Sequence, residues 1–140
     1  MNPIIKAAGL SWAMAQIVKI LVGLIRYGRK NRARTVWRAI WAGGMPSAHS
    51  ALITSSVLTI FLTMGAKSPL FGLALIMACI VIYDRSRAFA IYRTFQDRYP
   101  TLKQAVQNDP ILIDLVGHRL SEILFGVLIG LGCGILIVRL

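Results

Sequence analysis

The feature that most constrains this chain is a succession of long apolar runs, with the charged residues collected between them. The runs lie at about 3–25, 46–65, 69–83 and 120–138. Runs of this kind are typical of helices that cross a bilayer, which need about 20 apolar residues. Only 15% of the 140 residues are charged, and the mean hydropathy is +0.67, which is too apolar for an ordinary soluble domain. The sequence predicts one all-α integral membrane domain over 1–140, with about four transmembrane helices in a bundle and a basic, partly amphipathic cytoplasmic loop.

The positive charges indicate which way the bundle faces. Six follow the first run and six lie between the third and fourth runs: Arg26, Arg29, Lys30, Arg32, Arg34 and Arg38, then Arg85, Arg87, Arg93, Arg98, Lys103 and Arg119. With four crossings both groups share one side, which the positive-inside rule makes cytoplasmic in a cell membrane. The net charge of +11 does not indicate nucleic-acid binding, because the charges are confined to gaps between apolar runs.

Two features of the apolar runs leave alternatives open. The first run is longer than the apolar stretch of a signal peptide. It is also not followed by the cleavage site that a signal peptide has. Lys19 inside it is either a functional intramembrane charge or a side chain that extends to the interface. Cys79 and Cys133 are predicted to be packing residues, without the spacing of a metal site.

Small residues recur at every fourth position in the second and fourth runs. They are Ser47, Ala51, Ser55, Thr59 and Thr63 in one, and Gly126, Gly130 and Gly134 in the other. This spacing predicts close contact between membrane helices. The partner of the glycine face is either the second run of the same chain or the same helix of another subunit, which would give a homodimer.

The segment from Gly43 to Ser50, Gly-Gly-Met-Pro-Ser-Ala-His-Ser, is the best candidate for a binding site. Gly44 allows close approach of a ligand, and Pro46 suits the first position of a helix. Ser47 and His49 would then lie in the first turn, beside backbone N–H groups that favour phosphate. His49 adds a side chain that titrates near neutral pH.

A second constellation lies at the start of the fourth run. His118 precedes Glu122 by four residues, so the two side chains share a helix face. A carboxylate on one imidazole nitrogen leaves the other free to attack or to bind metal. Two histidines, an anion-binding helix start and several arginines are what phosphoryl transfer requires. A metal site is less favoured, because the chain has only two histidines.

These segments resemble the divergent branch of the type 2 phosphatidic acid phosphatase superfamily, which also includes the vanadium haloperoxidases. The resemblance rests on Gly-Gly-Met-Pro-Ser-Ala-His-Ser-Ala at 43–51, followed by Ser-Pro-Leu-Phe at 68–71, Ile-Tyr-Asp at 82–84 and Leu-Val-Gly-His at 115–118, with Glu122. It covers most of the chain from Gln16 onward.

The resemblance implies roles for individual residues. Lys19 and Arg26 have the spacing of the first signature and imply phosphate binding, although Tyr27 replaces its proline. The second signature implies that His49 is the general acid for the leaving alcohol. The third implies that His118 is the nucleophile, forming a phosphohistidine, and that Glu122 orients it.

The arginine of the third signature has no counterpart before His118, where Leu112 stands. Arg85 or Arg87, beside Asp84, is therefore the candidate arginine. The implied phosphate-binding set is Lys19, Arg26, Gly44, Ser47, Asp84, Arg85 and Arg87.

The sequence thus predicts a membrane phosphatase with a cytoplasmic site, acting on a lipid phosphate monoester or diphosphate without a metal or other cofactor. Phosphatidylglycerophosphate, phosphatidic acid and prenyl phosphate are candidate substrates. Two other functions stay open. One is a non-catalytic scaffold that binds anionic lipids, and the other is a small transporter that uses Lys19.

Overall fold

The computed structural model describes residues 2–27, 44–99, 101 and 117–140, which form four helices. They are α1 (Pro3–Tyr27), α3 (Ala48–Met64), α4 (Pro69–Arg98) and α7 (Leu120–Arg139). No strand occurs in these residues. The predicted all-α membrane fold is confirmed, since α1, α4 and α7 are each long and apolar enough to cross a bilayer and α3 is a shorter apolar helix.

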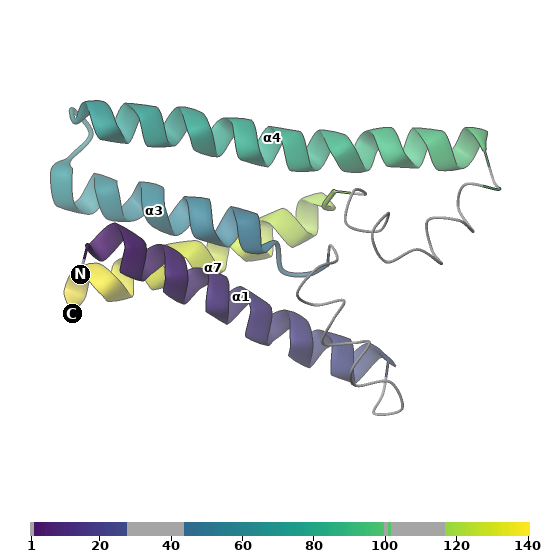
Figure 1. The fold of residues 1–140 in the computed structure, drawn as a ribbon, viewed down its shortest axis with the longest axis horizontal. Helices are drawn as coiled ribbons and strands as arrows, with labels where there is room; N and C mark the ends of the chain where they lie inside the picture. Colours follow the sequence, from purple (N-terminus) through teal and green to yellow (C-terminus); the bar gives the residue numbers. More distant parts are fainter. Residues whose placement is uncertain (1, 28–43, 100, 102–116) are drawn as a thin grey trace.

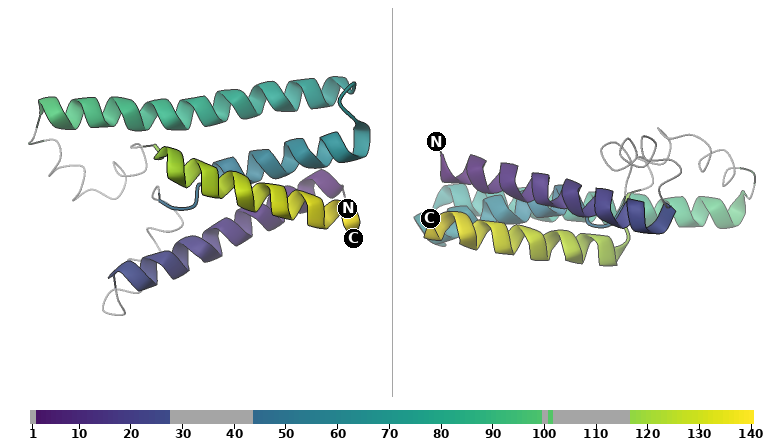
Figure 2. Two further views of the ribbon diagram at one scale, coloured as in Figure 1. Left: turned by 180° about the vertical axis from the view of Figure 1, so that it is seen from behind. Right: turned by 90° about the horizontal axis from the view of Figure 1, so that it is seen from below.

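Three of the helices form a packed group, and the fourth lies on its side. Figures 1 and 2 show α1, α3 and α7 crossing one another, with α4 running alongside α3. Helix α3 contacts all three of the others. The end of α1, the starts of α3 and α7 and the polar half of α4 all point toward the same end of the bundle, because successive helices alternate in direction (Figure 1).

The contact between α3 and α7 depends on residues without large side chains. A Cβ added at Gly126 would lie 2.3 Å from the Ser47 carbonyl oxygen, and one at Gly130 would lie 2.5 Å from that of Ala51. Gly134 packs against Leu58. In the structure, the glycine face of α7 therefore packs against α3 of the same chain. A homodimer stays a prediction, and it would have to use another surface.

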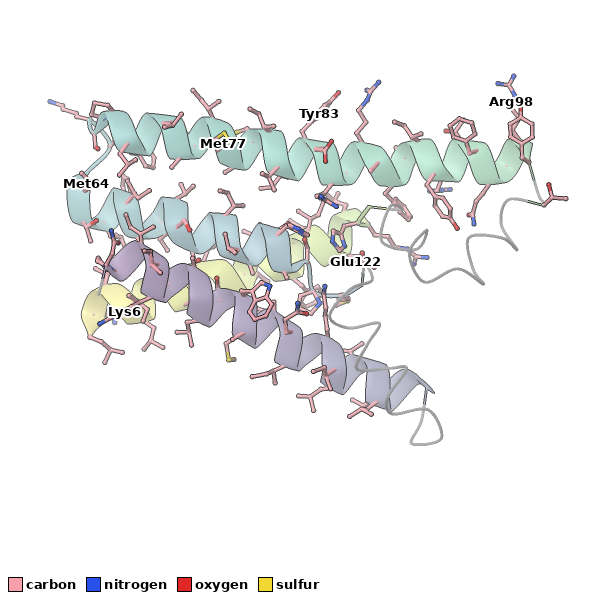
Figure 3. All side chains as sticks on the ribbon, viewed as in Figure 1. Lys6, Met64, Met77, Tyr83, Arg98 and Glu122 are labelled. Carbon is pink, nitrogen blue, oxygen red and sulfur yellow. The ribbon has the colours of Figure 1, made fainter. Side chains whose placement is uncertain are left out.

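The side chains inside the bundle are small and many are polar, whereas those on its outside are mostly large and apolar. Ser11, Ser47, Ser50, Ser55 and Thr59 are fully buried. Ser11 and Ser55 share a 2.8 Å hydrogen bond between α1 and α3. Bulky apolar side chains cover the outside of the helices (Figure 3), among them Leu73, Ile76 and Ile80 on α4 and Leu124 and Leu128 on α7. This distribution is typical of membrane bundles, in which lipid covers the large apolar residues.

Helix α4 is longer than the third apolar run. The run ends near Tyr83, but the helix continues without a break to Arg98, into the region expected to be a basic loop. Charged residues do not interrupt a helix, and the first proline after Pro69 is Pro100, which disfavours helix in the residue before it. At 1.5 Å per residue, the 30 residues of α4 span about 45 Å, more than the roughly 30 Å core of a bilayer.

Candidate active site

The segment that carries His118 is docked on α4 through its backbone. The His118 N–H donates a 3.1 Å hydrogen bond to the carbonyl oxygen of Arg85. Gly117 has a φ of +74°, and a Cβ there would lie 2.5 Å from the same oxygen. Glycine is required here both for its backbone conformation and for the close approach to α4. These two contacts fix where His118 enters the bundle.

Glu122 orients the imidazole of His118. The Nδ1 atom of His118 lies 3.1 Å from Oε2 of Glu122, and the His118 side chain is only 4% exposed. An ionised carboxylate can only accept, so Nδ1 donates, and in the neutral ring Nε2 then carries the lone pair. Glu122 Oε2 also accepts from the backbone N–H of Arg119. Figure 3 shows Glu122 far from Lys6 and Met64, which lie at the other end of the bundle.

The second histidine lies beside the first. His49 is in the first turn of α3, is exposed, and its ring centroid lies 6.4 Å from that of His118, with the ring planes at 52°. The start of α3 is tied to α7, because the Ser47 N–H donates a 2.9 Å hydrogen bond to the Glu122 carbonyl oxygen. Two histidines that are 69 positions apart in the sequence thus lie side by side at this end of the bundle.

Ser47 has a structural role at the start of α3. The helix begins at Ala48 with Ser47 as its N-cap, so the expectation that Pro46 is the first helical residue is wrong by two positions. The Ser47 hydroxyl accepts from the Ser50 N–H, and its own N–H is bonded to Glu122. Two donors that the sequence assigned to a phosphate are therefore bonded within the protein. Any contact of Ser47 with phosphate stays a prediction.

Lys19 approaches this end of the bundle from α1. It is buried, at 9% exposure. Ala15, one turn earlier, belongs to the same buried cluster as Ala48 and Ala51, which places Lys19 near the level at which α3 begins. Arg26 lies two turns further along α1, and its side chain is outside the described residues.

The contacts that the structure gives for the other predicted phosphate ligands do not involve either histidine side chain. The Nε atom of Arg85 lies 4.0 Å from Oδ2 of Asp84, and the Asp84 side chain is largely exposed. Arg87 donates a 3.1 Å hydrogen bond to the Tyr83 hydroxyl on its own helix. A Cβ at Gly44 would meet no atom within 4 Å, so close packing in the described structure does not require glycine there. The basic segment at 28–43 and the stretch at 102–116, including Leu112, lie outside the described residues.

Sequence reasoning did not single out a cleft between α4 and the start of α7. Its volume is about 920 Å³, and its lining comprises Ser86, Phe89, Tyr92, Arg93, Gln96, His118, Arg119, Leu120 and Ser121. Positions 89, 92, 93 and 96 share one helix face, and this signal becomes visible only once the region is treated as a continuous helix. Arg93 and Arg119 are thus two cations near His118 that the predicted set omits.

Among residues 2–27, 44–99, 101 and 117–140, no group of three His, Cys, Asp or Glu side chains is placed to hold a metal ion. His118 and Glu122 are bonded to each other instead. The described arrangement brings together the His118 imidazole, its carboxylate partner Glu122 and the second imidazole of His49. These are the parts of a covalent acid–base mechanism.

Comparison with known proteins identifies the family of this chain. A profile described as "Divergent PAP2 family" matches residues 1–133, nearly the whole chain. The chain belongs to the Divergent PAP2 family. PAP2 denotes the type 2 phosphatidic acid phosphatases, so the resemblance drawn from 43–51 and 115–122 is confirmed at the level of the family.

A curated relative is similar in length. The chain is 27% identical over 134 residues to the uncharacterized membrane protein YuiD of Bacillus subtilis (strain 168), covering 84% of this chain and 82% of that protein. No solved structure matches the chain. The Divergent PAP2 assignment and this relative support a membrane protein of phosphatase-like type.

Proposed function

We propose that this protein is a membrane phosphatase that removes a phosphate group from a lipid through a phosphohistidine on His118. The observation that carries the proposal is the 6.4 Å separation of the two imidazoles, combined with the His118–Glu122 hydrogen bond. A reacting phosphate needs its nucleophile at about 3–3.5 Å and a proton donor at about 2.6–3.2 Å from the leaving oxygen. The 6.4 Å distance between the ring centroids supports a single phosphate group that both rings reach.

The chemistry follows from the state of each ring. Nε2 of His118 attacks phosphorus with its lone pair while the bond to the alcohol oxygen breaks. His49, protonated, donates its proton to that oxygen, and the lipid alcohol leaves. Neutral His49 then takes a proton from water, whose oxygen attacks phosphorus and breaks the bond to Nε2. Inorganic phosphate leaves and His118 regains its lone pair.

Glu122 and the nearby cations stabilise charge during these steps. Nδ1 keeps its proton throughout, and the Glu122 carboxylate stabilises the positive ring that forms when Nε2 bonds to phosphorus. Lys19 and an arginine neutralise the equatorial phosphate oxygens, as phosphoryl transfer requires. The basic segments on the same side of the membrane support a site that faces the cytoplasm.

The test is phosphate release from defined lipids by purified protein in detergent micelles, with EDTA present. The substrates are phosphatidylglycerophosphate, phosphatidic acid and prenyl phosphate. We expect release by the wild type and by Lys67→Ala, an exposed substitution at the other end of the bundle. We expect at least about a hundredfold loss in His118→Ala and His49→Ala. Equal rates in all four proteins would contradict the proposal, and tight lipid binding without turnover would favour a scaffold.

A further inference from the structure

The cleft between α4 and α7 opens directly beside His118 and is not accounted for by the two-histidine chemistry. Among the described residues that line it, two carry guanidinium groups and none is acidic. A volume of about 920 Å³ is far more than one phosphate needs and falls in the range of small-molecule sites. The lining is also mixed, because aromatic rings, hydroxyls and an amide alternate with the arginines.

Arg93 belongs to α4, whereas Arg119 is the N-cap of α7 and contacts α4 one helical turn before Arg93. Arg119 lies with its guanidinium carbon 5.7 Å from the centre of the Phe89 ring, and Arg93 follows Phe89 by one helical turn. The backbone contacts of 117 and 118 with Arg85 fix the segment that carries Arg119 against the same helix. Arg119 therefore starts from a partly ordered position, which lowers the entropic cost of binding.

The remaining polar groups of the cleft suit a hydrogen-bonding ligand. Tyr92 and Gln96 are hydrogen-bonded to each other on the wall that carries Arg93. Arginine presents a planar array of donors that matches the oxygens of a phosphate. The cleft thus provides cationic and neutral donors in series, leading away from the reacting histidine.

We propose that this cleft binds a second phosphate group of the substrate, one that is not cleaved, through Arg93 and Arg119. The proposal rests on the proposed function, because it takes the reacting phosphate to lie at His118. Arg85, Phe89 and Arg93 mark successive turns of α4, so the second site is displaced from His118 by one to two turns, about 6–12 Å. That displacement favours two phosphates joined by a short polar spacer over a directly linked diphosphate.

The experiment compares lipids that differ in this one group. Phosphatidylglycerophosphate carries two phosphates separated by glycerol, and phosphatidic acid carries one. We expect Arg93→Gln and Arg119→Gln each to raise the KM for the first lipid about tenfold, with kcat little changed and phosphatidic acid affected less than about threefold. Arg98→Gln is the matched control, because it removes the same charge from an exposed position on α4 outside the cleft.

Several outcomes overturn the inference. Equal losses on both lipids would make the arginines general phosphate ligands, and no loss on either would leave the cleft without a role in recognition. A prenyl diphosphate that depends on both arginines as strongly as phosphatidylglycerophosphate would contradict the spacer.

A binding experiment distinguishes failure of the proposed phosphatase function from failure of the second phosphate site. If no lipid is hydrolysed, binding of the same two lipids in nanodiscs to His118→Ala tests the cleft alone. Tighter binding of phosphatidylglycerophosphate that is lost in the arginine variants would support the second site. Equal binding of the two lipids would refute it.

Discussion

At the level of single residues, the position of the His118 ring depends on one carboxylate and on backbone groups around it. Glu122 sets which ring nitrogen carries the proton, and the Arg119 N–H holds the same carboxylate oxygen in place. Gly117 lets the chain approach α4 closely enough for the His118 N–H to reach Arg85. The reactive nitrogen is thus positioned from two sides by short contacts.

Replacing Glu122 with glutamine tests the orienting role. Glutamine keeps an oxygen that accepts from Nδ1 but removes the negative charge that stabilises the positive ring. We expect kcat to fall about 10–100-fold with little change in KM, the size of effect seen when a partner of a functional histidine is altered. Steady-state phosphate release measures it, with the thermal midpoint in detergent as the control for folding. An unchanged kcat would remove Glu122 from the mechanism.

Replacing Gly117 with alanine tests the docking of this segment. The positive φ and the 2.5 Å approach to the Arg85 oxygen leave no room for a Cβ. We expect a stability loss of at least about 1–3 kcal/mol and a loss of phosphate release, because His118 is displaced. Thermal unfolding in detergent and activity are measured together. The matched control is Gly65→Ala, which has a similar φ of +79° but open space around it. Equal effects at both positions would contradict a packing role for Gly117.

At the level of helices, the sequence foretold some features and missed others for physical reasons. The small residues of α3 and α7 predicted a close contact, because that spacing has few other uses in an apolar helix. The spacing of the glycines could not show whether their partner helix is in the same chain or in a second subunit, because both partners would pack on the same glycine face. The full length of α4 was missed because the apolar run ends near Tyr83, although the arginines that follow are good helix formers.

The same limits apply to the candidate site. The residue types near 49 and 118 indicated acid–base chemistry, but their separation in space depends on how α3 and α7 cross, which no local pattern encodes. The hydrogen bond from the Ser47 N–H to the Glu122 carbonyl oxygen was missed because the two residues are distant in sequence. Arg93 and Arg119 were missed because the cleft depends on the continued course of α4.

The contact between α3 and α7 is tested by two glycines on one helix. A Cβ at Gly130 would lie 2.5 Å from the Ala51 oxygen, whereas one at Gly132 would meet nothing within 4 Å. We expect Gly130→Ala to lower stability by about 1–3 kcal/mol. We expect Gly132→Ala to be neutral or slightly stabilising, because alanine favours helix. Unfolding of the two variants in detergent is compared. Similar losses in both would contradict the packing described for this interface.

At the level of the whole molecule, the candidate site and the charged part of α4 lie at the same end of the bundle. The end of the bundle that holds both histidines also holds the polar half of α4, which carries Arg85, Arg87, Arg93 and Arg98. The polar half of α4 extends past the other helices at that end (Figure 1). A lipid headgroup at the membrane surface would meet the histidines, the cleft and the positive charges together.

The orientation of the bundle is tested by accessibility. In a background in which both native cysteines are replaced by serine, Arg98→Cys lies at the polar end of α4 and Lys67→Cys lies between α3 and α4. We expect a membrane-impermeant maleimide to label Lys67→Cys in intact cells, and to label Arg98→Cys only after the membrane is opened. The reverse pattern would place the histidines outside the cell.

The central claim is that His118 carries phosphate during turnover, and labelling tests it most directly. Protein is mixed with a lipid that is radiolabelled in its terminal phosphate, and the reaction is quenched within the first turnovers. The account predicts label on the wild type that is stable in alkali, is lost in acid, maps to the peptide containing His118, and is absent from His118→Ala. Label that persists in His118→Ala, or phosphate release from the wild type without any labelled protein, would contradict it.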